Sequence, residues 1–396
     1  MNNEKKEKTI KGLFTVAVVT FQQRHLLEDC LNSILKQDYP SIELIICDDD
    51  SCDFSPDEVR DYLLKQKREN IKKITIFKQK RNVGTSANCQ KALTLATGEY
   101  IKFQAGDDML KDKNVLSSMV NFFKKESANV LVTRAQACSE DGTLLDVLYP
   151  PDGHFNKAVK STPHQLFALI GTQPWGAFVC APAVFFRKSY LCKLGGFDSN
   201  YKFTEDWPLW LKICERNEPL TYIDKVTTIY RMGGISNDLS YINAGLGERH
   251  YLECIKLLKD YVFPRLREYS VFDRIRCWYS IESIKARIVK EKKWNSWRFY
   301  EKFIWKCGKI PFFLCSTLYQ FRNRSMYFSF DFEKKYLFLM AVLFYLNVPL
   351  YPEGPDRNLW AVGLVIGVLF IAIKYLVSVI VRFSKRFLDF RMKVIK

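Results

Sequence analysis

The first 110 residues alternate between short apolar runs typical of buried strands and segments whose apolar residues recur at helical spacing. Strands separated by single helices form βαβ units, in which consecutive strands lie parallel. The sequence therefore predicts an α/β domain with a mostly parallel sheet flanked by helices. The expected strands are 13–21, 42–50, 73–79 and 99–108, and the expected helices are 24–37, 56–68 and 85–97.

Two of these strands end in acidic clusters. One runs into three successive aspartates at 48–50, and a later one passes through Gly106 to Asp107 and Asp108. Ligands of open parallel sheets collect at the carboxyl ends of the strands, and both clusters fall at that edge. A single cluster is often a solvated turn, but two on one edge favour a binding site. Carboxylates at 107–108 suit Mg²⁺ or Mn²⁺, which in turn binds a diphosphate.

The formal net charge of +17 is concentrated in the C-terminal third. Residues 255–335 hold 19 Lys and Arg against 8 Asp and Glu, and residues 382–396 hold 6 against 1. The remaining chain is close to neutral, so a near-neutral domain precedes a strongly basic region. The 12 cysteines form no CxxC pair and no Cys/His cluster with zinc spacing, which is typical of reduced thiols in a cytoplasm.

The basic region 255–335 interleaves cations with bulky aromatic residues, a composition that suits the headgroups of an anionic bilayer. Two apolar runs follow, at 336–351 and 359–381. The second is long enough to span a bilayer, whereas the first is short of the roughly 20 residues that a span needs. Basic outer flanks predict a hairpin anchor with both ends cytoplasmic. Two buried core helices, or docking without crossing, are the alternative.

Several segments carry a resemblance when taken in order: VVTFQQRHLLEDCLNSILKQDYPSIELIICDDDSCD, RNVGTSANCQKALTLATGEYIKFQAGDDML, FFRKSYLCKLGGFD and EDWPLWLKI. Over residues 13–236 the chain resembles the family 2 glycosyltransferases of GT-A fold, of the bacterial surface-polysaccharide type. The resemblance implies a Rossmann-like domain and a nucleotide-diphosphate-sugar donor, usually a UDP-sugar. It also implies transfer of the sugar to a hydroxyl group with inversion at the anomeric carbon.

The same resemblance implies roles for particular residues. Asp206 would be the general base, with Glu205 as the less favoured candidate. Asp107 and Asp108 would hold the divalent cation, Mn²⁺ or Mg²⁺, that bridges the two phosphates, and Asp49 would accept the uracil N–H. The other residues expected in the nucleotide site are Thr20, Phe21, Arg81, Asn82, Gly84 and Asn88.

Two tryptophans, Trp175 and Trp207, are candidate acceptor contacts, because an indole can form an apolar platform for a sugar ring. Tryptophan is more often a packing residue, which is the alternative for both. Likewise, Glu205 and Asp206 without the resemblance would be read as a helix cap, since acids are common in a first turn.

The sequence departs from the family pattern at two places. Ala105 replaces the first aspartate of the family's Asp-x-Asp metal motif, and Met232 and Gly233 stand where many members carry a histidine after Tyr-Arg. These departures leave open a non-catalytic relative that only binds the nucleotide. The basic third leaves open a nucleic-acid-binding protein, but it lies beside membrane-length apolar runs rather than a nucleic-acid motif. No nucleic-acid partner is therefore expected.

We accordingly expect an enzyme at the cytoplasmic face of the cell (inner) membrane, bound to anionic lipids and acting on a glycan or lipid-linked glycan. The oligomeric state is left open. The expected organisation is a flexible N-terminus at 1–12, a GT-A domain at 13–250, a basic helical region at 251–335, a membrane hairpin at 336–381 and a basic tail at 382–396.

Overall fold

The computed structural model describes residues 9–66, 68–172, 178–232 and 246–269, together with 273, 277, 280, 281 and 284. The chain divides into two compact units, Met1–Ile288 and Val289–Lys396, and every described residue lies in the first. The predicted membrane hairpin and basic tail, and most of the basic region, therefore lie outside the described residues. Within the described part of the chain, no helix combines the length and apolar character needed to cross a membrane.

Four parallel strands form one half of the sheet, in the order β3-β2-β1-β4. All the elements expected over residues 13–108 are confirmed, with small differences at their ends, and β1 begins within the segment expected to be flexible. The strands are β1 (Ile10–Thr20), β2 (Ile42–Asp48), β3 (Ile71–Lys78) and β4 (Gly98–Ala105), joined by α1 (Arg24–Leu35), α2 (Pro56–Gln66) and α3 (Thr85–Leu95).

The other half of the sheet is mixed, which corrects the expectation of a mostly parallel sheet. β8 (Val184–Arg187) lies antiparallel to both β4 and β6 (Val130–Cys138), and β6 lies parallel to β9 (Thr221–Arg231). β5 (Met109–Leu110) pairs antiparallel with β9, and β7 (Leu144–Tyr149) pairs antiparallel with β6. The short turn between β6 and β7 is one physical reason, since a tight hairpin joins only antiparallel strands.

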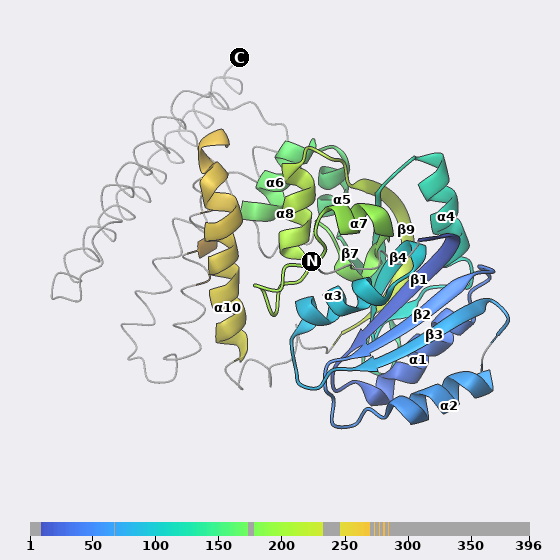
Figure 1. Cartoon of the computed structure of the whole chain (residues 1–396). Coiled ribbons are helices and arrows are strands. Elements are labelled where there is room, and N and C mark those ends of the chain that lie inside the picture. The colour runs from blue at the N-terminus through green and yellow to red at the C-terminus, as the bar shows by residue number, and fades with distance from the viewer. Residues whose placement is uncertain are drawn as a thin grey trace, which may run out of the picture. The chain divides into compact units, whose positions relative to one another are not determined.

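Side chains of β1 alternate between the two faces of the sheet, as strand geometry requires. Phe14, Val16 and Val18 pack in one apolar cluster with α1, α2 and α4 (Val115–Lys125). Ala17 belongs to a second cluster with α3, α6 (Pro163–Thr172) and α8 (Trp207–Glu215). Helices thus cover both faces of the sheet (Figure 1). The remaining elements before residue 200 are α5 (Asp152–Val159), η1 (Ala181–Ala183) and α7 (Lys188–Lys193).

The first unit continues past residue 250, where the domain was expected to end. Helix α10 (Leu246–Leu257) is followed by η2 (Leu258–Val262) and η3 (Phe263–Glu268). Cys254, Leu257, Leu258 and Val262 are buried in the same cluster as α6 and α8. The expected boundary therefore falls inside a helix that packs on the domain core (Figure 1).

Candidate active site

The loops that follow β2 and β4 both attach to the end of β1. The N–H of Asp49 donates to the carbonyl of Thr20, and the N–H of Gly106 donates to the carbonyl of Val19, each at 3.0 Å. A Cβ at Gly106 would lie 2.6 Å from Thr20 Oγ1, so this close approach requires glycine. The two acidic clusters therefore flank the same strand end, and the predicted common edge is confirmed.

Asp49 orders the turn that precedes α3. Its Oδ1 accepts the N–H of Val83 and its Oδ2 accepts the N–H of Gly84, both at 2.8 Å. Gly84 has φ +90°, a conformation that favours glycine. Burial raises the pKa of Asp49, while these two backbone N–H groups lower it. Each carboxylate oxygen has a second lone pair, so the uracil contact stays a prediction.

The neighbouring aspartates have different positions. Asp48 is buried and accepts two hydrogen bonds from Ser51, from the N–H at 2.9 Å and the hydroxyl at 2.5 Å. Asp50 is exposed with φ +69°. The first aspartate therefore closes the turn, the second orders the 81–84 segment and the third faces solvent.

The other residues expected in the nucleotide site differ in exposure. Thr20 and Asn88 are buried, Phe21 is half-buried, and Arg81 and Asn82 are exposed. Asn88 donates through Nδ2 to the carbonyl of Cys47 at 2.8 Å, which ties α3 to the end of β2. Helix α3 begins after Gly84, and no side chain makes a cap hydrogen bond there.

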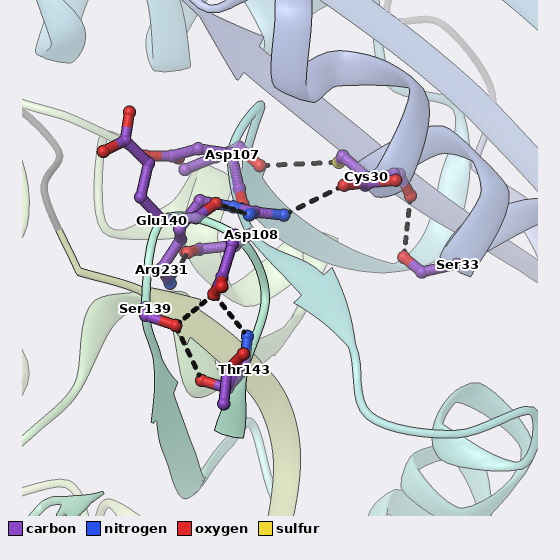
Figure 2. Close-up of polar contacts among 11 residues, drawn as sticks. Cys30, Ser33, Asp107, Asp108, Ser139, Glu140, Thr143 and Arg231 are labelled. Atoms are coloured by element: carbon purple, nitrogen blue, oxygen red, sulfur yellow. Dashed lines mark hydrogen bonds and ion pairs between the residues drawn. The ribbon is translucent and has the colours of Figure 1, made fainter. Parts of the chain in front are cut away.

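Arg231, at the end of β9, holds the loop of Asp107 and Asp108 (Figure 2). Its N–H donates to Asp108 Oδ1 at 3.0 Å, and its Nε donates to the carbonyl of Asp107 at 3.1 Å. The guanidinium also donates to the carbonyl of Glu140, in the β6–β7 turn, and to Asp29 Oδ2 at 3.0 Å. One buried arginine thus joins α1, the β6–β7 turn and the predicted metal loop.

Burial dominates the electrostatics of this loop. It raises the pKa of Asp108 to about 8, assisted by the charge of Asp107, while Lys102 and Arg231 act in the opposite direction. Burial also raises the pKa of Asp107 and lowers the pKa of Lys102 to about 8. Lys102 Nζ donates to the carbonyl of Pro182 at 2.5 Å. Two buried cations therefore offset two crowded carboxyl groups.

A cation site requires several ligand atoms close together. In the described part of the chain, no group of three or more His, Cys, Asp or Glu residues is arranged to hold a metal ion. However, Asp108 Oδ2 is buried without a hydrogen-bond partner there. Mg²⁺ in nucleotide sites commonly takes one or two carboxylates and completes its shell with phosphates and water. Asp107 and Asp108 fit a cation of that kind.

The Glu205–Asp206 pair precedes α8, and both side chains are half-buried. Asp206 precedes the first residue of α8 but makes no side-chain cap hydrogen bond. Its Oδ2 instead accepts the indole N–H of Trp210 at 3.3 Å. Burial raises the pKa of both carboxyl groups. Asp206 and Glu253 raise the pKa of Glu205 further, to about 8, whereas the Trp210 hydrogen bond lowers that of Asp206.

Two thiols, the buried Cys89 and the half-buried Cys180, lie within electrostatic reach of the three acidic groups. Burial raises the pKa of Cys89, and the charges of Glu205, Asp206 and Asp49 raise it further. Burial likewise raises the pKa of Cys180, with contributions from Asp108 and Asp206. Acids from the loops after β2 and β4 and from the start of α8 therefore lie within electrostatic reach of shared neighbours.

The structure describes one of the two tryptophans predicted as acceptor contacts. Trp207 is 8% exposed, and its indole N–H donates to the carbonyl of Ile170 at 3.1 Å. Its position inside the second apolar cluster is that of a packing residue, which does not fit the predicted sugar platform. Trp175 lies outside the described residues.

Sequence reasoning missed Arg231 and Lys102. Each is a cation within or at the end of an otherwise apolar strand, EYIKFQA for Lys102 and VTTIYR for Arg231. A charge in a buried strand is expensive unless it is paired, and this cost was the available signal.

Residues 15–194 match the family model described as Glycosyl transferase family 2. These residues are therefore similar to glycosyltransferase family 2 domains. Together with the mixed sheet and its flanking helices, the match makes the fold GT-A-like.

Curated relatives include glycosyltransferases of bacterial envelope synthesis. TuaG of Bacillus subtilis (strain 168), provisionally named for teichuronic acid biosynthesis, is 30% identical over 38% of this chain and 59% of its own length. The Processive diacylglycerol beta-glycosyltransferase of Mycoplasma genitalium is 27% identical over 58% of this chain and 68% of its own. WfgD of Escherichia coli, a UDP-Glc:alpha-D-GlcNAc-diphosphoundecaprenol beta-1,3-glucosyltransferase, is 25% identical over 52% of this chain and 71% of its own. The chain thus spans about six-tenths of the length of TuaG.

Solved structures with some likeness include S. aureus TarS 1-349 in complex with UDP-GlcNAc, at 16% identity and a TM-score of 0.46 over 70% of this chain and 81% of that chain. The mannosyltransferase PcManGT from Pyrobaculum calidifontis, in complex with GDP-Man and Mn²⁺, has 15% identity and a TM-score of 0.43 over 73% of this chain and 82% of that chain.

Proposed function

We propose that the chain is a glycosyltransferase that moves a sugar from a UDP-sugar to a hydroxyl group of a lipid-linked or cell-surface glycan, with inversion. The observation that carries this proposal is the shared edge: the loops of Asp49 and Asp107 flank the end of β1. The family 2 match over residues 15–194 supports the same conclusion independently.

The donor would lie along this edge. The 81–84 turn and Asp49 form a corner suited to a nucleobase, because each Asp49 oxygen that accepts a backbone N–H keeps a second lone pair for an N–H of the base. The diphosphate would then lie toward Asp107 and Asp108. A divalent cation bound there by these two residues, Mn²⁺ or Mg²⁺, would stabilise the negative charge that develops on the departing diphosphate.

Asp206 is the better candidate for the general base. The hydrogen bond from Trp210 favours its ionised form, whereas Glu205 faces the charges of Asp206 and Glu253 and favours its protonated form. The pair would thus hold its proton on Glu205 in preference to Asp206. A carboxylate whose pKa is raised by burial removes a hydroxyl proton more effectively than an exposed one.

We further propose a location at the cytoplasmic face of the membrane. The support comes from sequence: a basic, aromatic region at 255–335 followed by apolar runs at 336–351 and 359–381. Relatives named for diacylglycerol and diphosphoundecaprenol substrates are in keeping with an acceptor presented at a bilayer.

The test is release of UDP by the detergent-solubilised full chain, incubated with Mn²⁺, a panel of UDP-sugars and membrane extract as acceptor. We expect one donor to be turned over, and Asp206→Asn to bind UDP normally while losing about 10²- to 10⁴-fold in kcat. Asp57→Asn, at an exposed carboxyl on α2, is the matched control.

Full activity in Asp206→Asn would refute the assignment of the base. UDP binding without turnover of any donor would instead favour a non-catalytic relative. Salt-sensitive RNA binding without UDP binding would favour a nucleic-acid-binding protein.

A further inference from the structure

The loop at 202–204, which leads directly to Glu205 and Asp206, is bound by a single carboxylate from α10. Glu253 Oε1 accepts the N–H of Phe203 at 2.7 Å and both the N–H and the hydroxyl of Thr204 at 2.8 Å. Glu253 Oε2 accepts the N–H of Lys202 at 2.6 Å. Three successive backbone N–H groups and one hydroxyl therefore converge on one side chain.

The hydrogen bonds to the Glu253 carboxylate hold the loop strongly. Hydrogen bonds to an ionised acceptor are roughly twice as strong as bonds between neutral groups. Successive N–H groups that point to one anion also fix the backbone conformation of the segment that carries them. Because Thr204 lies two residues before Asp206, fixing residues 202–204 fixes the entry of the chain into the catalytic pair.

The helical segment α10–η2 also holds the start of the same loop. The hydroxyl of Tyr261 donates to Asp198 Oδ2 at 2.7 Å, and the hydroxyl of Tyr201 donates to Asp260 Oδ2 at 2.8 Å. The segment is itself anchored in the core, since Cys254 is only 2% exposed. The whole stretch from 198 to 204 is therefore fastened to one rigid element.

The loop also touches the donor side of the site. A Cβ built at Gly84 would lie 2.2 Å from Cγ of Lys202, so the stem of Lys202 lies directly against the turn that Asp49 orders. The charge of Lys202 in turn lowers the pKa of Asp49. A displacement of residues 202–204 would therefore change the positions of both the proposed base and the donor turn.

We propose that Glu253 is a positioning residue, which holds the 202–204 loop so that Asp206 is correctly placed for proton removal. This rests on the proposed function of Asp206. Glu253 lies beyond residue 194, where the family match ends, as does Asp206 itself. A misplacement of about 1 Å in a reacting group can cost roughly 10²-fold in rate.

The experiment compares three variants of the full chain. Glu253→Gln keeps the shape of the side chain but removes its charge and half of its acceptor capacity. Thr204→Val removes only the hydroxyl contact. Glu268→Gln is the matched control, because Glu268 makes only a 3.7 Å ion pair with Arg265 in η3. Amide hydrogen exchange over residues 198–206 and the steady-state constants are measured for each.

We expect Glu253→Gln to lose amide protection at 202–204 and to lose about 10- to 100-fold in kcat, with a smaller change in the donor KM, which reflects the contact of Lys202 with the donor turn. Thr204→Val should give a smaller loss in both, and Glu268→Gln none. Unchanged protection in Glu253→Gln would overturn the inference, and so would lost protection with an unchanged kcat. A wild-type chain that turns over no donor would overturn the proposed function instead. In that case, the amide protection of Glu253→Gln would still show whether Glu253 holds the loop.

Discussion

The loop after β2 is held by its neighbours in the first half of the sheet, whereas the loop after β4 and the loop before α8 depend on distant parts of the chain. Asp49 bonds to Val83 and Gly84, within the same run of βαβ units. In contrast, Arg231 reaches back to Asp107 and Asp108, and Glu253 reaches back to residues 202–204.

This difference separates the site into two parts. The donor corner lies entirely within the β3-β2-β1-β4 half and is supported by adjacent strands. The loop before the proposed base and the predicted metal loop are fixed by side chains from α10 and β9, respectively. We therefore expect changes at the ligand-facing carboxylates to affect activity or binding with little effect on folding, and loss of the distant contacts of Arg231 or Glu253 to affect stability and geometry.

The largest expected effect comes from Asp107→Asn. The loss of a charged group from the diphosphate site should lower kcat by about 10²- to 10³-fold, because it removes stabilisation of the developing charge. The thermal midpoint should stay close to that of wild type. UDP release and thermal unfolding are measured beside Asp38→Asn, an exposed control. Wild-type turnover by Asp107→Asn would break the proposed placement of the diphosphate.

Arg231→Met tests the second part of the comparison. Removing the buried guanidinium leaves the carbonyls of Asp107 and Glu140 without their donor and removes a cation that offsets the Asp107–Asp108 pair. We expect the free energy of unfolding to fall by roughly 3 kcal/mol, measured by urea denaturation. Arg265→Met, at a partly exposed ion pair with Glu215, is the control and should change it by less than about 1 kcal/mol. Equal losses in the two variants would contradict the account.

Asp49→Asn should have an intermediate effect. An amide has only one acceptor oxygen, so it cannot serve both the N–H of Val83 and that of Gly84, and its own NH₂ faces a donor. We expect a cost of about 1–2 kcal/mol, seen as a rise of roughly 5- to 30-fold in the Kd for UDP. Calorimetric titration is the measurement, and Asp50→Asn, at the exposed neighbour, should bind as wild type does. Normal UDP affinity in Asp49→Asn would contradict the proposal that Asp49 contacts the nucleotide.

The smallest expected effect is on pH dependence. The base must be ionised, so kcat/KM falls as pH falls through its pKa, which burial raises above the ordinary range for Asp. Trp210→Phe removes a hydrogen bond that favours the ionised form of Asp206, so the acid limb of the profile should move to higher pH. Trp207→Phe is the matched control, since that indole bonds to Ile170 instead. Equal profiles in the two variants would argue against Asp206 as the base.

The sequence predicted the β3-β2-β1-β4 half of the sheet well, because the periodicity of apolar residues is a local signal. The acidic clusters were located for the same reason, since each directly follows a strand. The order of strands in the second half could not be predicted in this way. β4 pairs with β8, with Lys102 opposite Phe185, and no local sequence pattern predicts that pairing. The mixed sheet follows from such distant contacts.

The site residues follow the same division. Asp49 and Asp107 were candidates from the sequence because each lies in an acidic cluster after a strand, whereas Glu253 was not, because an acid on an amphipathic helix usually faces solvent. Trp207 was misjudged for a related reason: an aromatic beside candidate catalytic acids suggests a sugar contact, but its helix turns it into the core. What decides each case is the packing partner, which lies far away in the sequence.

A crystal structure of the full chain with UDP and Mn²⁺ would test the central claim most directly. The account predicts the uracil against Asp49 and the 81–84 turn, the diphosphate beside Asp107, and the Asp206 carboxylate facing the space where an acceptor hydroxyl would enter. UDP bound away from the end of β1, or out of contact with both Asp49 and Asp107, would contradict it.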